Sequence, residues 1–245
     1  MKIALASVPV KNRDTKFNLQ TMIDTIKGCS KKADLILFGE AVLQGFDSLC
    51  WDYEKDLLTA VSLTDAPIRR VCETAKDNGI AVSFGFIERV YDVLYSSQIF
   101  IDADGEIVNV FHRVSPGWKY HWVTDNRYKE GTGFEVFSYE EKTFAIGLCG
   151  DLWTEGRPEE MKALHADAVL WPVWCDYDAD NWNKKIKYEY AKQAALCGND
   201  VYLVNPFCAD PNPESCAAGC GLHFRNGNIL AERAAGTAGI LITEI

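Results

Sequence analysis

Residues 143–153 read TFAIGLCGDLW, an apolar and β-prone run that ends at Leu148 and turns abruptly into Cys149, Gly150 and Asp151. The run predicts a buried strand, and the glycine after the cysteine predicts a tight turn. A cysteine on such a turn is presented at the edge of a sheet. Cys149 is therefore a candidate nucleophile, and the groups that would activate it must come from elsewhere in the chain.

The composition limits the class of protein. The chain has 245 residues, of which 48% are hydrophobic, and this is enough to build one large α/β domain. The net charge of −10 argues against nucleic acid or an anionic membrane as the main partner, because both require basic patches. No Pro/Gly/Ser-rich linker divides the chain, so we expect a single domain over residues 1–245.

The cellular compartment is predicted from the start of the chain and from its cysteines. A short apolar run at residues 2–10 is followed at once by Lys11, Asn12, Arg13 and Asp14, which favours a first strand over a signal peptide. No apolar run reaches the roughly 18 residues of a membrane span. The nine cysteines are an odd number and are scattered, as expected of reduced and mostly buried thiols. We therefore expect a cytoplasmic protein.

Hydrophobic periodicity predicts a mixture of single strands alternating with helices and strands that come in pairs, which indicates a layered α/β domain with mixed sheets. Helices are expected over residues 18–30, 65–77, 158–165 and 181–197. Strands are expected over residues 2–8, 34–38, 80–87, 95–102, 106–113, 134–137, 143–148, 168–172, 201–205, 220–224, 228–233 and 238–244. Residues 43–63 and the aromatic-rich segment that follows Arg113 are expected to be irregular.

Three of the predicted strands deliver polar side chains at their ends: Glu40, the segment 113–119, and Cys149. Sites in α/β proteins gather at strand ends, so these residues are expected to meet. A thiol becomes a good nucleophile when a base removes its proton, and a carboxylate in a partly apolar pocket is a suitable base. A cation and the Gly150 N–H would stabilise an oxyanion. The set predicts acyl transfer through a thioester.

Nine sequence motifs follow one another along nearly the whole chain: KIALASVPV, FNLQTMIDTI, ADLILFGEAVLQGF, IAVSFGFIERV, LYSSQIFIDADGEIVNVFHR, FAIGLCGDLW, ADAVLWPVW, VYLVNPF and GLHFRNGNILAE. Their ordered combination is specific, although each motif alone is weak. With these motifs the chain resembles the nitrilase superfamily of carbon–nitrogen hydrolases. The resemblance implies an α-β-β-α sandwich, a Glu-Lys-Cys triad, no cofactor, and a homo-oligomer.

Under this resemblance Glu40 matches the general base, Cys149 the nucleophile and Asp151 an acidic residue that supports the site. The lysine has two candidates, because Arg113 stands where the family usually has it and the next lysine is Lys119. Arginine keeps its proton near neutral pH, whereas lysine can both stabilise an oxyanion and exchange a proton. We favour Lys119, brought back to the strand end by the Pro-Gly turn before it, and keep Arg113 as the alternative.

Several other positions depart from the family pattern. Gly39 stands where a proline usually precedes the glutamate, and Gly150 stands where an aromatic residue commonly follows the cysteine. The second acidic residue of the family has no clean match, and we prefer Asp125 to Glu130. These departures change the wall of the pocket and so bear more on the substrate than on the reaction class.

Aromatic and cysteine-rich segments supply the remaining site predictions. Trp118 and Trp174 are predicted to contact the substrate, with Trp174 the stronger candidate because it follows a strand end. Cys216 and Cys220 have a permissible spacing for zinc, but no second pair completes a site, so we expect no metal.

The sequence thus predicts a hydrolase that cleaves a small linear amide through a cysteine thioester. Two alternatives stay open. One is a nitrilase or an N-carbamoyl amine hydrolase with the same triad, and the other is a catalytically silent relative that acts as a binding or assembly module.

Overall fold

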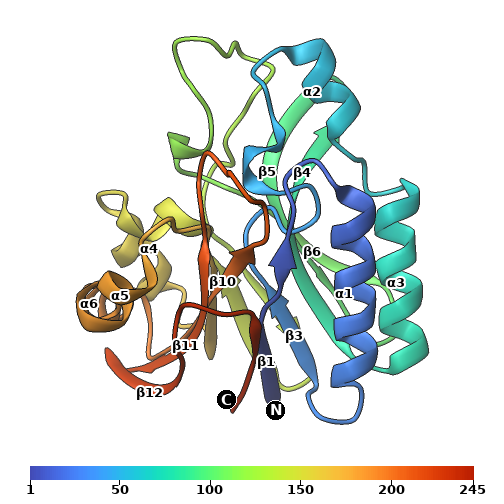
Figure 1. Ribbon diagram of the computed structural model, residues 1–245. Coiled ribbons are helices and arrows are strands. Elements are labelled where there is room, and N and C mark those ends of the chain that lie inside the picture. Colours follow the sequence, from blue (N-terminus) through green and yellow to red (C-terminus); the bar gives the residue numbers. More distant parts are fainter.

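The computed structural model describes residues 1–245 and contains two mixed β-sheets packed face to face between helices (Figure 1). The first sheet has the order β13-β1-β3-β4-β5-β6. Its strands are Gly239–Glu244 (β13), Lys2–Ser7 (β1), Leu35–Phe38 (β3), Ala81–Val90 (β4), Val93–Ile101 (β5) and Ile107–His112 (β6).

The second sheet has the order β12-β11-β10-β9-β8-β7, and β2 (Pro9–Val10) pairs with β10. Its central strands β8, β9 and β10 are parallel, and antiparallel strands flank them. The strands are Asn228–Arg233 (β12), Ala218–Arg225 (β11), Asp200–Cys208 (β10), Ala168–Pro172 (β9), Lys142–Ile146 (β8) and Val136–Tyr139 (β7).

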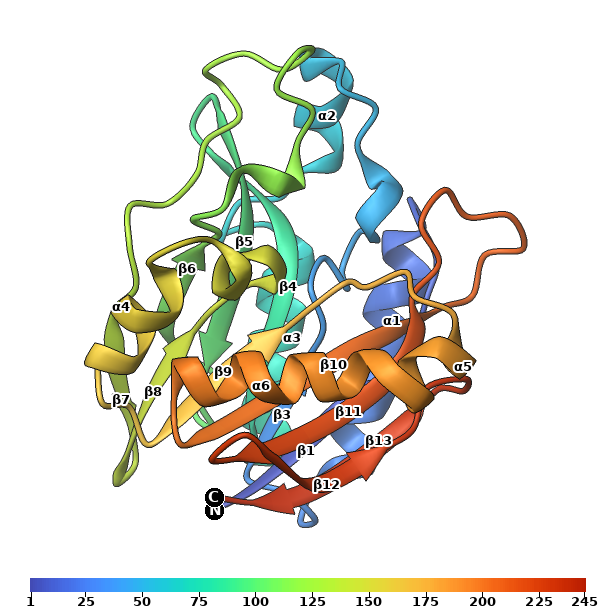
Figure 2. The same cartoon turned by 90° about the vertical axis from the view of Figure 1, so that its left-hand side faces the viewer.

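Helices cover the outer face of each sheet. In Figure 1, α1 (Thr15–Cys29) and α3 (Ala66–Asn78) lie against the first sheet. In Figure 2, α6 (Lys187–Cys197) crosses the second sheet, with α4 (Arg157–Ala163) near it. The layers are therefore helix, sheet, sheet and helix, which confirms the predicted α-β-β-α sandwich. None of the helices is both long and apolar enough to cross a lipid bilayer.

The alternation of side chains along the strands builds the layers. On β3, Ile36 and Phe38 pack in the cluster that includes residues of α1 and α3, whereas Leu35 and Leu37 pack in the cluster between the sheets. Ile146 of β8 joins that inner cluster from the opposite sheet. Because each strand in the centre is buried on both faces, its residues form continuous apolar runs rather than an alternating pattern.

Most predicted elements are present with shifted ends. The first helix begins earlier than predicted, because the Asp14 side chain accepts a hydrogen bond from the Phe17 N–H and caps it there. The helix predicted over 181–197 is interrupted, since a π-helical turn at Trp182–Ile186 separates α5 (Ala179–Asn181) from α6. The region 43–63 is largely irregular as predicted and contains a 3-10 turn at Phe46–Ser48 and the short helix α2 (Tyr53–Thr59).

Candidate active site

Glu40 and Arg113 form a buried ion pair at the ends of two strands of the first sheet. Glu40 lies two residues beyond β3 and Arg113 directly follows β6. The Arg113 Nη1 donates to Glu40 Oε1 at 2.7 Å, and the two side chains are 4% and 1% exposed. Ser96 Oγ also donates to Oε1, at 3.4 Å, whereas the buried Oε2 has no hydrogen-bond partner. The second carboxylate oxygen is thus available for a proton.

The Arg113 guanidinium has one nitrogen left for a ligand. Its Nε donates to Ser115 Oγ at 2.9 Å and its Nη1 is held by Glu40, but Nη2 donates to no protein acceptor. Burial opposes the charge, but the negative groups around Arg113, with Glu40 first, outweigh it and raise the pKa of Arg113 above its ordinary value. Arg113 is therefore a permanent cation with one free donor.

Cys149 lies on the strained turn that the sequence predicts after β8. Its φ is 45°, in the left-handed region that most side chains avoid. The Cys149 carbonyl accepts a hydrogen bond from Trp171 Nε1 at 3.0 Å, and Sγ lies 3.6 Å from the Trp174 carbonyl oxygen. A hydrogen bond with the Cys175 side chain, burial and the charge of Glu40 raise the pKa of the Cys149 thiol, and Arg113 opposes them. The resting thiol therefore needs a base.

Asp151 ties the cysteine turn to the arginine segment. It is fully buried and accepts hydrogen bonds from three backbone N–H groups: Leu148 at 2.9 Å, Val114 at 3.1 Å and Ser115 at 2.7 Å. Burial raises the pKa of Asp151 to about 6, against the opposing charge of Arg113 and these hydrogen bonds, so the carboxyl group is mainly ionised at neutral pH. Because Leu148 follows β8 and Val114 follows β6, one carboxylate connects the two sheets at the site.

The structure does not bring Lys119 to Glu40. Lys119 Nζ lies 2.8 Å from Glu130 Oε1 and donates to the Tyr128 carbonyl at 2.5 Å, and it has no ion pair with Glu40. Asp125, the preferred second acid, is exposed and pairs with Arg127 at 2.7 Å. Lys119 and Asp125 thus pair with other residues in the structure, and Arg113, the alternative, is the cation that contacts Glu40.

Gly150 makes room for the guanidinium. A Cβ added at Gly150 would lie 2.8 Å from Arg113 Nη2 and 3.4 Å from Ser115 Oγ, so the free nitrogen lies against the backbone next to Cys149. An arginine is longer and broader than a lysine, and the missing side chain at position 150 offsets this size. The two departures from the family pattern, Arg113 and Gly150, are thus spatially linked.

The glycine at position 39 is explained by the ring of Pro206, which lies beside it. A Cβ at this position would lie 2.5 Å from Cδ of Pro206, whose ring occupies the space beside the Gly39 backbone. Pro206 belongs to β10, and its ring occupies the space that a side chain at position 39 would need. The approach of β10 to β3 therefore requires glycine at position 39.

An aromatic cavity of about 330 Å³ is lined by residues of the segment that follows Arg113. Of the two predicted substrate contacts, Trp118 lines this cavity, whereas Trp174 is 4% exposed and does not line it. The ring of Phe46 stacks on Trp174 at 5.7 Å. Gly117 also lines the cavity and faces Arg113 Nη2, since an added Cβ would lie 3.3 Å from that nitrogen. The other lining residues are Phe46, Asp47, Leu49, Trp51, Lys119, Tyr120, Asp176, Glu214 and Ser215.

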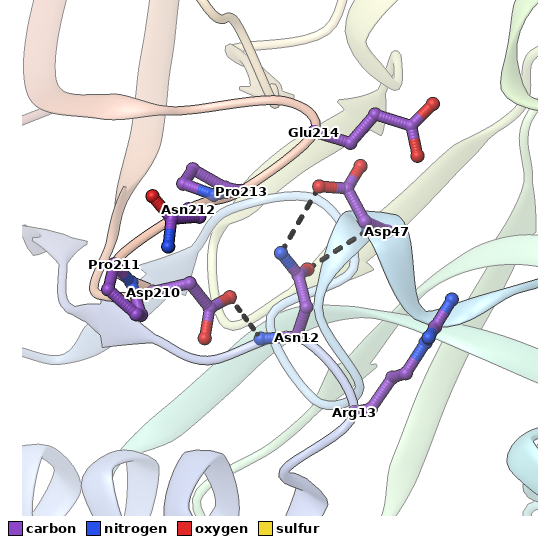
Figure 3. Close-up of a pocket in the computed structure, with 8 residues that line it drawn as sticks. All are labelled: Asn12, Arg13, Asp47, Asp210, Pro211, Asn212, Pro213 and Glu214. Atoms are coloured by element: carbon purple, nitrogen blue, oxygen red, sulfur yellow. Dashed lines mark hydrogen bonds between the residues drawn. The ribbon is translucent and has the colours of Figure 1, made fainter.

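A second cavity, of about 340 Å³, lies beside the first and shares Asp47 and Glu214 with it. Figure 3 shows Asn12 between two acidic residues: its side chain binds Asp47, and its backbone N–H donates to Asp210 at 2.8 Å. Burial, followed by the charges of Glu214 and Asp210, raises the pKa of Asp47, against two backbone hydrogen bonds. Three acidic side chains, Asp47, Asp210 and Glu214, therefore line this cavity together with Arg13.

Three groups near the site were not predicted from the sequence: Ser96, Ser115 and Cys175. Ser115 follows Arg113 closely in the chain, and its position within the SPGW turn was a usable signal. Ser96 and Cys175 lie in apolar segments, where a polar or thiol side chain is usually structural. No group of three histidine, cysteine or acidic side chains is arranged to hold a metal ion.

Comparisons with known proteins agree with this architecture. The family model described as carbon-nitrogen hydrolase matches residues 2–245. A cyanide hydratase of Gibberella baccata is 31% identical over 123 residues, which are 47% of this chain and 33% of that protein. An N-carbamoylputrescine amidase of Solanum lycopersicum is 23% identical, over 65% of this chain and 54% of its own length. The chain thus spans about a third to a half of these curated relatives.

A solved structure extends the likeness to the whole fold. The crystal structure of an amidase from Nesterenkonia sp. aligns with a TM-score of 0.76 at 20% identity, covering 100% of this chain and 90% of that one. At this identity the likeness concerns the fold, whereas the family match extends over almost the entire sequence. This chain belongs to the carbon–nitrogen hydrolase family, the nitrilase superfamily.

Proposed function

We propose that this protein hydrolyses a non-peptide C–N bond of a small amide through a thioester on Cys149, with Glu40 as the base and Arg113 as the cation. The observation that carries the proposal is the free Nη2 of Arg113. It lies against Gly150, the residue after Cys149, while the rest of the guanidinium is fixed by Glu40 and Ser115. A donor fixed in this way is suited to charge that develops only in the transition state.

The chemistry of each side chain determines its proposed role in the reaction. Glu40 Oε2, which has no other partner, would take the proton of the Cys149 thiol, and the thiolate would attack the amide carbonyl. Arg113 Nη2 and the Gly150 N–H would hold the oxyanion. The Gly150 N–H is one of the first in the helical turn Cys149–Trp153, where N–H groups lack partners within the turn.

The second half of the reaction relies on the same glutamate. Glu40 would give its proton to the departing ammonia or amine and then accept one from the water that attacks the thioester. Arg113 contributes charge alone, because a guanidinium does not exchange its proton near neutral pH. The proton transfers therefore all pass through Glu40.

The charge of the cavity favours a second candidate reaction, hydrolysis of an N-carbamoyl amine. Asp47, Asp176 and Glu214 line the cavity, and its one cation, Lys119, is already paired with Glu130. Aromatic rings in the same wall, including Trp51 and Tyr120, add faces that attract cations. A substrate that carries an ammonium group fits this wall better than one that carries a carboxylate. One of the relatives, the N-carbamoylputrescine amidase of Solanum lycopersicum, is named for an N-carbamoyl amine substrate.

A panel of substrates tests both candidates. Ammonia release is measured for amides with neutral, cationic and anionic acyl groups, for the matching nitriles, and for carbamoyl amines, and intact mass follows the acyl-enzyme. We expect hydrolysis of an amide or a carbamoyl amine, faster with cationic than with anionic substrates, and a covalent adduct on Cys149. An adduct on another cysteine, or activity that survives Cys149→Ala, would contradict the mechanism. Absence of both turnover and adduct would favour the silent binding module.

Replacing Gly150 with alanine is expected to disable the site without unfolding the protein. The new methyl group would displace Arg113 Nη2, and a shift of about 1 Å in a positioned group can lower a rate by about 10²-fold. The rate of Cys149 acylation and a crystal structure of the variant check this. Gly28→Ala is the matched control, because no atom lies within 4 Å of its added Cβ. Acylation of Gly150→Ala at the wild-type rate would show that Arg113 needs no such room.

A further inference from the structure

We propose that Cys149 and Cys175 form a reversible disulfide when the protein meets a peroxide. The nucleophile of the site would then also be a modification site, with Cys175 as its resolving partner. No disulfide is present in the structure, where both cysteines are free thiols.

The main chain places the two thiols next to each other. Cys149 Sγ lies 3.6 Å from the carbonyl oxygen of Trp174, whose peptide group leads directly to Cys175. Since a carbonyl oxygen and the following Cα are roughly 2.8 Å apart, Cys149 Sγ lies within roughly 6.4 Å of the Cys175 Cα. In the proposed disulfide, rotation of the two side chains would close the remaining gap. The effect of Cys175 on the pKa of Cys149 agrees with this proximity.

Both cysteines are held in place by neighbouring groups. Asn205 accepts a hydrogen bond from the Cys175 N–H at 3.0 Å and donates to its carbonyl at 2.9 Å. Tyr190 Oη lies 3.0 Å from Cys175 Sγ, where it can share the thiol proton. Trp171 Nε1 fixes the Cys149 carbonyl. The pair is therefore prearranged, and a disulfide would cost little conformational entropy.

Exposure gives the two thiols different roles. Cys149 is partly exposed beside the site, whereas Cys175 is 6% exposed. A small oxidant would therefore reach Cys149 first, and the sheltered Cys175 would react only with the oxidised Cys149. Thiolate character and exposure decide which cysteine a peroxide attacks, and Glu40 provides a base beside Cys149.

The chemistry balances in two steps. The Cys149 thiolate attacks one peroxide oxygen, so that an S–O bond forms, the O–O bond breaks and hydroxide leaves, taking up the thiol proton as water. Cys175 then loses its proton and attacks the Cys149 sulfur, so that the S–S bond forms, the S–O bond breaks and a second water leaves. The two sulfurs lose two electrons, and the peroxide gains them.

Mass spectrometry of the full-length protein tests the proposal. The reduced protein is treated with a small excess of hydrogen peroxide, quenched, alkylated and digested without reductant. We expect a loss of two hydrogen atoms from the intact mass, a single linked pair of peptides containing Cys149 and Cys175, and full reversal by dithiothreitol. Oxidation of Cys149 to sulfinic acid without a linked peptide, or a link from Cys149 to another cysteine, would overturn it.

Two variants sharpen the test. Cys175→Ala should abolish the link and leave Cys149 to proceed to sulfinic acid. Cys220→Ala removes another buried cysteine of the same hydrophobic cluster and should form the link as the wild type does. Because the readout is mass and not turnover, the result is independent of the proposed hydrolase activity.

Discussion

An Arg113→Ala variant is expected to acylate Cys149 at least about 10²-fold more slowly than the wild type, because the proposed oxyanion donor is lost. The same change leaves Glu40, which is 1% exposed, without its cation. Breaking a buried pair in this way costs about 3–5 kcal/mol of folding free energy. Rates of adduct formation followed by intact mass, together with urea denaturation, measure the two effects.

Two further variants separate the loss of charge from the loss of fold. Arg113→Lys keeps a positive charge beside Glu40 and should recover most of the stability, but an ammonium group lacks the fork that reaches Glu40 and Gly150 together. Lys119→Ala is the matched control at the position we first favoured. Lys119 pairs with Glu130 and not with Glu40, so we expect its removal to slow acylation much less than the removal of Arg113. If Lys119→Ala stops acylation and Arg113→Ala does not, the assignment of the cation is reversed.

An Asp151→Ala variant is expected to lose at least about 3 kcal/mol of folding free energy, since it leaves three backbone N–H groups without their acceptor and a buried unpaired donor costs about 1–3 kcal/mol. Acylation of Cys149 should fall as well, because the segments that carry Arg113 and Cys149 would no longer be tied together. Denaturation in urea near neutral pH gives the free energy, and the adduct assay gives the rate.

Asp167→Ala is the comparison for this variant. The Asp167 carboxylate also accepts a backbone N–H, from Thr143 at 2.8 Å, but the residue is exposed, so water can replace it. Asp167→Ala should therefore lose much less folding free energy than Asp151→Ala. Equal losses for the two variants would mean that the buried hydrogen bonds of Asp151 do not support the site in the way we infer.

The sequence alone predicts much of the fold, for reasons visible in single strands. Residues 35–38 are apolar on both faces, which predicts a buried strand, and a polar residue just beyond it is expected at the edge of the sheet. The same argument places Cys149. The break in the predicted helix 181–197 was not foreseeable, because the π-helical turn at Trp182–Ile186 has no proline or glycine to signal it.

The cation of the site could not be decided from the sequence. Lys119 and Arg113 lie six residues apart, and the intervening Pro-Gly turn allows either to reach Glu40. The outcome depends on Glu130 and the Tyr128 carbonyl, which hold Lys119 away from the site. Lys119, Tyr128 and Glu130 are close in sequence. The position of Tyr128 depends on a distant residue, because its hydroxyl donates a hydrogen bond to the buried Asp56. A long irregular loop carries no periodicity from which such contacts can be read.

Because the site lies across the two sheets, mutations in the core between the sheets can affect it. Glu40 and Arg113 follow strands of one sheet, and Cys149 follows a strand of the other, so the distance between the base and the sulfur depends on how the two sheets pack. The packing of the sheets depends on interleaved side chains such as Leu37 and Ile146, which are core residues and not part of the site. A larger or smaller side chain at one of these core positions would change the distance between the sheets. It would thereby move the Cys149 sulfur relative to Glu40 without changing any residue of the site.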